Sequence, residues 1–296
     1  MTCRFALAGS VLALILCLAP CAHAHRAWML PSSTVLSATD AWVTVDAAIS
    51  NDLFYFDHNP MRLDGLAITA PDGSPVKAEN AATGKFRSTF DVPLRQPGTY
   101  KVAVVSETVA AQYEVGGEVK RWRGPAAAFT SEVPADAKNL QVARTHSRTE
   151  VFVTAGKPTD TVFRPTGVGI ELVPITHPND LVQGEPASFR LLRDGAPLRD
   201  LAVSVIPGGI RYRDTLREIA VRTDGEGAFT VRFPDAGMYW LSASMRTGGA
   251  PSPAGEHAGV AMPPAASSGA SAASGPPPFR PGARVLYGVT LEVMAK

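Results

Sequence analysis

The sequence predicts an all-β protein made of two tandem β-sandwich domains. The first observation is that short apolar or alternating stretches recur between turn-forming residues, with turn signals about every 8–12 residues, as in β-sandwiches. The second is that this pattern starts again at Ile170, after the glycine-containing segment 166–169, which predicts a linker. The predicted domains cover residues 25–165 and 166–296.

Residues 1–24 have the three parts of a signal peptide. Arg4 supplies a positive charge, an apolar run extends from residue 5 to residue 18, and Ala22-His23-Ala24 is a small-x-small cleavage site. The apolar run is shorter than the roughly 20 residues that span a membrane, and no other segment approaches that length. We therefore expect cleavage after Ala24, export to the periplasm, and a mature chain without a membrane span.

The three cysteines, Cys3, Cys17 and Cys21, all lie in the predicted signal peptide. The mature chain would then contain no thiol, which excludes disulfides, thiolate metal sites and cysteine nucleophiles. An alternative is that residues 18–21 form a lipoprotein box, although proline before the cysteine fits that pattern poorly. Acylation of Cys21 would keep His25 inside the chain.

The charge balance gives no case for a highly charged partner. The chain has 28 Lys and Arg residues, of which Arg4 lies in the signal peptide, against 27 Asp and Glu residues. The mature chain is therefore formally neutral, and its composition favours neither nucleic acid nor an anionic membrane as a partner.

The first domain is predicted strand by strand from apolar and alternating stretches. These stretches lie at residues 35–36, 42–45, 66–69, 86–92, 99–105 and 150–154. Pro60 makes the aromatic and acidic segment 51–61 a loop or the end of a strand. Between residues 110 and 143 the pattern is weaker, where 118–123 predicts a hairpin arm and 134–142 one short helix.

The second domain shows a clearer strand pattern. Strands are predicted at residues 188–192, 201–206, 216–222, 228–233, 238–244 and 284–293. Turns at Asp194-Gly195 and Asp224-Gly225 resemble those of small transthyretin-like or immunoglobulin-like modules. Of the 36 residues from 247 to 282, 29 are Ala, Gly, Pro or Ser, which predicts a flexible insert without a core of its own.

The candidate functional residues are histidines. The predicted mature chain contains His25, His58, His146, His177 and His257. Cleavage after Ala24 would give His25 a free α-amine beside its imidazole, two nitrogen donors on one residue. An α-amine has an unperturbed pKa of about 7.7–8.0, so a metal could displace its proton near neutral pH. With one further imidazole the set suits the tetragonal geometry of Cu(II) or Ni(II) better than tetrahedral zinc. The alternative is that His25 is only a frayed terminal residue.

His58 is the best second ligand, because it lies in the aromatic loop and follows Asp57, which could orient its imidazole from outside the coordination sphere. His146 is a third candidate, although two nearby arginines disfavour a cation. We expect His177 to cap a loop and His257 to be solvated in the insert.

Several motifs resemble one bacterial family. They are "His-Arg-Ala-Trp-Met-Leu-Pro-Ser" from His25, "Ser-Asn-Asp-Leu-Phe-Tyr-Phe-Asp-His-Asn-Pro-Met" from Ser50, "Ala-Pro-Asp-Gly-Ser" and "Glu-Leu-Val-Pro-Ile-Thr-His-Pro-Asn-Asp-Leu". The chain is similar to the exported domain-of-unknown-function family often labelled as the periplasmic component of cobalt or nickel uptake systems. The resemblance implies a metal-handling protein of the nickel uptake transporter kind, and its two most specific motifs contain His25 and His58.

Three functions remain open. The first is a non-enzymatic periplasmic protein that binds nickel, cobalt or copper through His25, His58 and His146 and passes it to an importer or outer-membrane receptor. The second is a copper enzyme, because an N-terminal histidine plus one other on a β-sandwich is also the copper site of lytic polysaccharide monooxygenases. The third is a metal-free envelope scaffold or adhesion module.

Overall fold

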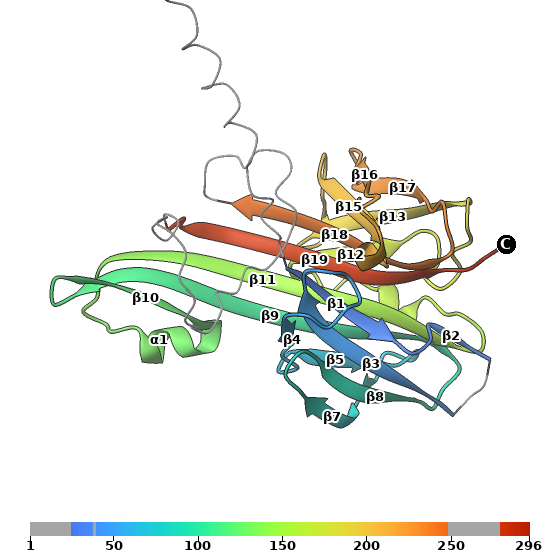
Figure 1. Ribbon diagram of the computed structural model, residues 1–296, viewed down its shortest axis with the longest axis horizontal. Helices are drawn as coiled ribbons and strands as arrows, with labels where there is room; N and C mark the ends of the chain where they lie inside the picture. The colour runs from blue at the N-terminus through green and yellow to red at the C-terminus, as the bar shows by residue number, and fades with distance from the viewer. Residues whose placement is uncertain (1–24, 38–39, 248–278) are drawn as a thin grey trace, which may run out of the picture.

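The computed structural model describes residues 25–37, 40–247 and 279–296. The predictions of a signal peptide at 1–24 and of a flexible insert, apart from its ends, concern residues outside these ranges. Strands account for 57% of the residues and helices for 5%, so the all-β prediction is confirmed. The strands form three sheets (Figure 1).

A ten-stranded central sheet has the order β16-β15-β18-β19-β11-β9-β5-β6, with β10 paired to β9 and β2 paired to β11. Its strands are β2 (Val35–Leu36), β5 (Leu66–Thr69), β6 (Pro75–Val76), β9 (Gly98–Val115), β10 (Glu118–Pro125), β11 (Lys138–Ala155), β15 (Ala202–Pro207), β16 (Ile219–Arg222), β18 (Gly237–Thr247) and β19 (Gly282–Val293). The central sheet thus takes strands from both predicted domains. They meet where β11 pairs in parallel with β19.

Two smaller sheets pack on opposite faces of the central sheet. The first contains β1 (Arg26–Pro31), β3 (Ala41–Ser50), β4 (Asn59–Pro60), β7 (Glu79–Thr83) and β8 (Ser88–Leu94). The second contains β12 (Ile170–Pro174), β13 (Pro186–Arg193), β14 (Ala196–Pro197) and β17 (Ala228–Arg232).

The alternation of side chains along β11 shows how the two faces are used. Val151 and Val153 lie in the core beneath the first small sheet, whereas Phe152 lies in the core beneath the second. Successive residues of a strand point to opposite faces, so one strand supplies both cores. We call these the first face, covered by β1, and the second face, covered by β12 and β13. The chain therefore forms two sandwiches around one shared sheet.

A smaller third core joins β1 to β15 and β18 of the central sheet. Trp28 of β1 is fully buried with Trp240 and Ile206, and Phe54 and Phe56 pack against them. The next residue of β1, Met29, is equally buried in the core of the first sandwich. Both sides of β1 are therefore enclosed, and the strand is held firmly on the first face.

The outer parts of β9, β10 and β11 form an arm that extends beyond the sandwiches, at the left of Figure 1. The 3₁₀ turns η1 (Ala126–Ala128), η2 (Thr161–Phe163) and η3 (Ile210–Tyr212) and one α-helix, α1 (Phe129–Glu132), complete the structure. The arm and α1 share a small core that includes Tyr113, Trp122 and Val133. The prediction of a helix at 134–142 was wrong: the helical turn ends before it, and residues 138–142 belong to β11.

Candidate functional site

The structure brings His25 and His58 into direct contact. Their imidazole rings stack with centroids 3.7 Å apart and an interplanar angle of 12°. His25 immediately precedes β1, while His58 ends the aromatic loop that connects β3 to β4. The strand pairs β1–β3 and β3–β4 bring the two histidines together, since Arg26 pairs with Ser50 and Asn59 pairs with Ile49.

The loop before His58 is closed by hydrogen bonds to Asp57. Its two carboxylate oxygens accept the backbone N–H groups of Asn51 at 3.0 Å and of Asp52 at 3.4 Å. Asp57 thus positions its neighbour His58 through the loop backbone. The sequence predicted that Asp57 would act on the imidazole itself.

The same loop is anchored below by Trp28. The indole N–H of Trp28 donates to the hydroxyl of Ser50 at 2.6 Å, and this hydroxyl donates to the carbonyl of Asp52 at 2.5 Å. Phe54 packs edge-on against Trp28 with ring centroids 5.4 Å apart. Phe54 has a φ of 61°, an unfavourable conformation for an aromatic residue that persists where the surroundings enforce it. The loop that carries His58 is therefore anchored on buried aromatic side chains.

The Nε2 atom of His58 is the candidate ligand atom of this site. It is buried and accepts or donates no hydrogen bond within the described part of the chain. Buried polar atoms normally have a partner, because leaving one unsatisfied costs about 1–3 kcal/mol. An unpaired ring nitrogen beside a second imidazole fits a metal that has nitrogen ligands.

His146 lies away from this pair, on the second face of the central sheet. On β11 its side chain points to the face opposite that of Ser147. His146 pairs with Val285, whose side chain lies in the core of the second sandwich. Its ring touches Gly169, where a β-carbon would lie 2.3 Å from the imidazole. The central sheet thus separates His146 from His25 and His58, and the three predicted ligands do not converge. Among the described residues no group of three or more His, Cys, Asp or Glu side chains is arranged to hold a metal.

His177 has a structural role, as predicted for a loop cap. Its Nδ1 accepts the backbone N–H of Asn179 at 3.1 Å, so Nε2 carries the proton and donates to the hydroxyl of Thr99 at 3.0 Å. Asn179 in turn bonds to Thr154 and to the carbonyl of Phe152. This motif joins the second half of the chain to β9 and β11. His257 lies outside the described residues.

Acid should destabilise the fold through His146 and His177. Burial lowers the pKa of His177, and burial together with the Arg148 charge lowers the pKa of His146. The unfolded chain then binds protons at a higher pH than the folded chain, so the free energy of unfolding should decrease as pH falls below about 6.5. Urea denaturation at pH 7.5 and 5.5 measures this decrease. The decrease in unfolding free energy between the two pH values should be smaller in His177→Gln. An unchanged pH dependence in that variant would contradict the lowered pKa of His177 as its cause.

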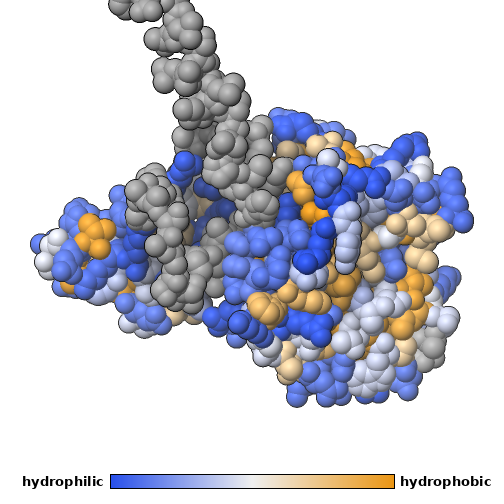
Figure 2. Space-filling model, in the orientation of Figure 1, coloured by the Kyte–Doolittle hydropathy of each residue, from blue (hydrophilic) through white to orange (hydrophobic). Residues whose placement is uncertain are grey.

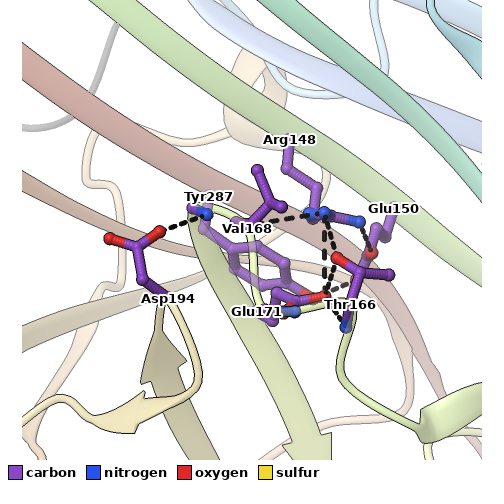
Figure 3. Close-up of polar contacts among 9 residues, drawn as sticks. Arg148, Glu150, Thr166, Val168, Glu171, Asp194 and Tyr287 are labelled. Atoms are coloured by element: carbon purple, nitrogen blue, oxygen red, sulfur yellow. Dashed lines mark hydrogen bonds and ion pairs between the residues drawn. The ribbon is translucent and has the colours of Figure 1, made fainter.

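A buried charged cluster that the sequence analysis missed lies on the second face (Figure 3). Arg148 contacts Glu150 at 3.2 Å and Glu171 at 3.6 Å, and all three side chains are at most 6% exposed. The hydroxyl of Tyr287 donates to Glu150 at 2.7 Å, and burial beside this carboxylate raises the pKa of Tyr287 well above its usual value.

The cluster connects the linker to the central sheet. Burial would raise the pKa of Glu171, but it is lowered overall because the carboxylate accepts hydrogen bonds from Thr166 and Gly167 and faces Arg148. Arg148 also donates to the carbonyl of Val168. The one signal for this cluster in the sequence is a pair of charges, two residues apart, immediately before the apolar end of a strand. Apart from Nε of Arg148, which has no hydrogen-bond partner in the described structure, the charged groups bond to one another and to the linker, which indicates a structural role.

Comparison with known proteins gives a family but no function. No curated protein matches the chain. Among solved structures, the human OSCAR ligand-binding domain is 14% identical, covers 77% of this chain and 93% of its own, and has a TM-score of 0.18. The D0-D1 domain of intimin is 11% identical, covers 73% of this chain and 88% of its own, and has a TM-score of 0.19. No helix among the described residues is long and apolar enough to cross a membrane.

The family model "Domain of unknown function (DUF4198)" matches residues 22–247, a range that contains the stacked histidines, the aromatic loop and the charged cluster. The match covers well over half of the sequence. The chain therefore belongs to the DUF4198 family.

Proposed function

We propose that this protein binds a divalent transition metal, nickel, cobalt or copper, in the periplasm and passes it to an uptake system without catalysing a reaction. The partner would be an importer or an outer-membrane receptor. The observation that supports this function is the stack of His25 on His58 at 3.7 Å, in which the buried Nε2 of His58 has no hydrogen-bond partner among the described residues.

Cleavage after Ala24 would complete the donor set. The α-amine and Nδ1 of His25 then bind as a chelate, and the imidazole of His58 adds a third nitrogen. The lone pair of an imidazole nitrogen lies in the ring plane, so two parallel stacked rings do not point at one ion. Metal binding therefore requires one ring to rotate out of the stack. His25 is the ring expected to move, because the Asp57 hydrogen bonds and the packing of Phe54 hold the loop of His58.

Blocking the amine should weaken metal binding. We expect correctly processed protein, with its N-terminus verified by mass, to bind Ni²⁺ or Cu²⁺ at one site. A leading methionine before His25 should lower the affinity by at least about tenfold, or 1.4 kcal/mol. His58→Ala should have a similar effect. Isothermal titration calorimetry of the three proteins measures the difference.

His146→Ala is the matched control, because it removes an imidazole from the opposite face of the central sheet and should leave the affinity unchanged. Equal affinity in the blocked and processed proteins would remove His25 from the site. A loss of affinity in His146→Ala equal to that in His58→Ala would contradict the separation of the two faces.

A copper enzyme is the second candidate, favoured by the pairing of an N-terminal histidine with one other on a β-sandwich. Such an enzyme needs exposed aromatic or polar side chains that grip a polysaccharide. Trp28 does not provide this surface, because it is fully buried, while Tyr55 is 37% exposed and lies under the guanidinium of Arg211. Ascorbate-driven peroxide formation and oxidised glycans from the copper-loaded protein would favour the enzyme. Equilibrium dialysis without metal uptake would favour a metal-free scaffold.

A further inference from the structure

A loop from the second half of the chain packs against the aromatic loop that carries His58. It connects β15 to β16 and comprises residues 208–218. Ile210 of this loop packs against the small third core. The guanidinium of Arg211 lies over the ring of Tyr55, 4.1 Å from the ring centroid. Tyr55 is three residues before His58, so the β15–β16 loop reaches the surroundings of the proposed metal ligand.

The closest approach of the two loops is at Gly208. A β-carbon at this position would lie 2.9 Å from Cδ2 of Phe54 and 3.2 Å from the carbonyl oxygen of Met238. The N–H of Gly208 donates to the same carbonyl at 2.8 Å, which ties the start of the β15–β16 loop to β18. Only glycine therefore allows the backbone to lie directly against the Phe54 ring. This contact is part of the surroundings that enforce the φ of 61° at Phe54.

Arg213 holds the β15–β16 loop in shape. Its Nε donates at 2.8 Å, its Nη2 donates at 2.5 and 3.0 Å, and its Nη1 donates as well, to four backbone carbonyls in all, those of Thr215, Pro207, Leu216 and Gly208 respectively. The fixed fork of a guanidinium suits several acceptors at once.

The tip of the loop does not provide a core of its own. The turn η3 contains no buried residue, and Tyr212 within it is 84% exposed. Hydrophobic and hydrophilic side chains are mixed on the visible surface around β15 and β16 (Figure 2). The shape of the loop therefore depends on the hydrogen bonds of Arg213 and on the contacts with the aromatic loop.

The β15–β16 loop also faces the residue that follows His25. Burial lowers the pKa of Arg26, and the carboxylates of Asp52 and Glu218 partly offset this by raising it. Glu218 is the last residue of the β15–β16 loop. Nη1 of Arg26 donates to the carbonyl of Asn51 at 2.7 Å, at the start of the aromatic loop. One loop of the second half thus lies beside the neighbours of both stacked histidines.

We propose that the β15–β16 loop controls the metal affinity of the histidine pair, and that Arg213 is the positioning residue through which it acts on His58. This inference rests on the proposed function. Arg213 fixes the backbone around Gly208, Gly208 lies against Phe54, and Phe54 belongs to the loop that carries His58. The site then depends on both halves of the chain, although its ligands lie in the first half. Displacing the β15–β16 loop would release His58 and lower the affinity, so this loop is where the site can be regulated.

A double-mutant cycle with Ni²⁺ as the probe tests the proposal. In processed protein Arg213→Gln should lower the nickel affinity by at least about tenfold, as His58→Ala does. When His58→Ala is already present, Arg213→Gln should change the affinity by less than about twofold, because the ligand that it positions is gone. A general loss of stability would instead lower the affinity in both backgrounds. Isothermal titration calorimetry of the four proteins measures the cycle.

Gly208→Ala is a second variant, which displaces Phe54 without removing a charge and should cause the same loss. The matched controls are Arg217→Gln and Gly225→Ala. Arg217 lies on the same loop but pairs with Asp235 on the surface at 2.8 Å, and a β-carbon at Gly225 would meet no atom within 4 Å. Both controls should bind nickel as the unmodified protein does.

Hydrogen exchange of the backbone amides of residues 51–58, measured without metal, tests the contact between the loops independently. Exchange should be at least about tenfold faster in Arg213→Gln and Gly208→Ala, and unchanged in the two controls. Unchanged exchange in Arg213→Gln, or an equal loss of nickel affinity with and without His58, would overturn the proposal and leave the metal site intact. Absence of nickel binding in the unmodified protein would overturn the proposed function and with it the control of affinity, while faster exchange would still show that Arg213 holds the aromatic loop.

Discussion

Replacing Arg148 by methionine should lower the free energy of unfolding by about 3–5 kcal/mol, because the change leaves buried carboxylates without their cation. Arg148 is enclosed with Glu150 and Glu171, and it is the one cation paired with these two carboxylates in the described structure. Methionine fills a similar volume, so the expected loss comes from charge and hydrogen bonding. Urea denaturation at pH 7.5, followed by far-UV circular dichroism, measures it.

The control for this variant is Arg144→Gln on the same strand. Arg144 is exposed, so its removal should change the stability by less than about 0.5 kcal/mol. A triple variant that also carries Glu150→Gln and Glu171→Gln should recover part of the loss, because it no longer buries unpaired carboxylates. If Arg148→Met unfolds at the same urea concentration as the unmodified protein, the cluster does not hold the linker to the sheet.

The individual strands were predictable because each carries its own pattern. Alternating or apolar stretches bounded by Pro and Gly turns placed strands at β3, β8 and β13 and through most of the second half. The shared central sheet could not be predicted in this way. It depends on the parallel pairing of β11 with β19, whose paired residues are more than 130 positions apart, and no local pattern specifies a partner at that distance.

The weak pattern between residues 110 and 143 also has a physical cause. This segment forms the arm, whose first face carries polar and small side chains and whose second face packs on a core of only a few residues. With little apolar surface to bury, the strands show little alternation. The helical turn η1–α1 is short and contains no buried residue, so no helical period marks its position.

The site was predictable in its ligand types and only partly in its geometry. The contact of His25 with His58 follows from two motifs that the sequence analysis singled out, and the strand pairs β1–β3 and β3–β4 place them together. The face on which His146 lies depends on the register of β11, which the sequence does not reveal.

Trp28→Ala should lower both the stability and the metal affinity. Trp28 is fully buried between Trp240 and the aromatic loop, so truncation to alanine should cost about 3–5 kcal/mol of unfolding free energy. It also removes the hydrogen bond to Ser50 and the ring against which Phe54 is held. The loop that carries His58 would then lose its fixed position, and we expect nickel affinity to fall by at least about tenfold.

Trp42→Ala separates this effect from a general loss of tryptophan. Trp42 lies on β3 of the same small sheet, is 44% exposed and contacts Arg95 on the surface, so its removal should cost less than about 1 kcal/mol and leave nickel binding unchanged. Calorimetry and urea denaturation on both variants make the comparison. A Trp28→Ala protein that is strongly destabilised but binds nickel as tightly as the unmodified protein would show that His58 does not depend on the buried aromatic side chains. The metal would then be held by the terminal residue alone, since the chelate formed by the amine and imidazole of His25 needs no support from the fold.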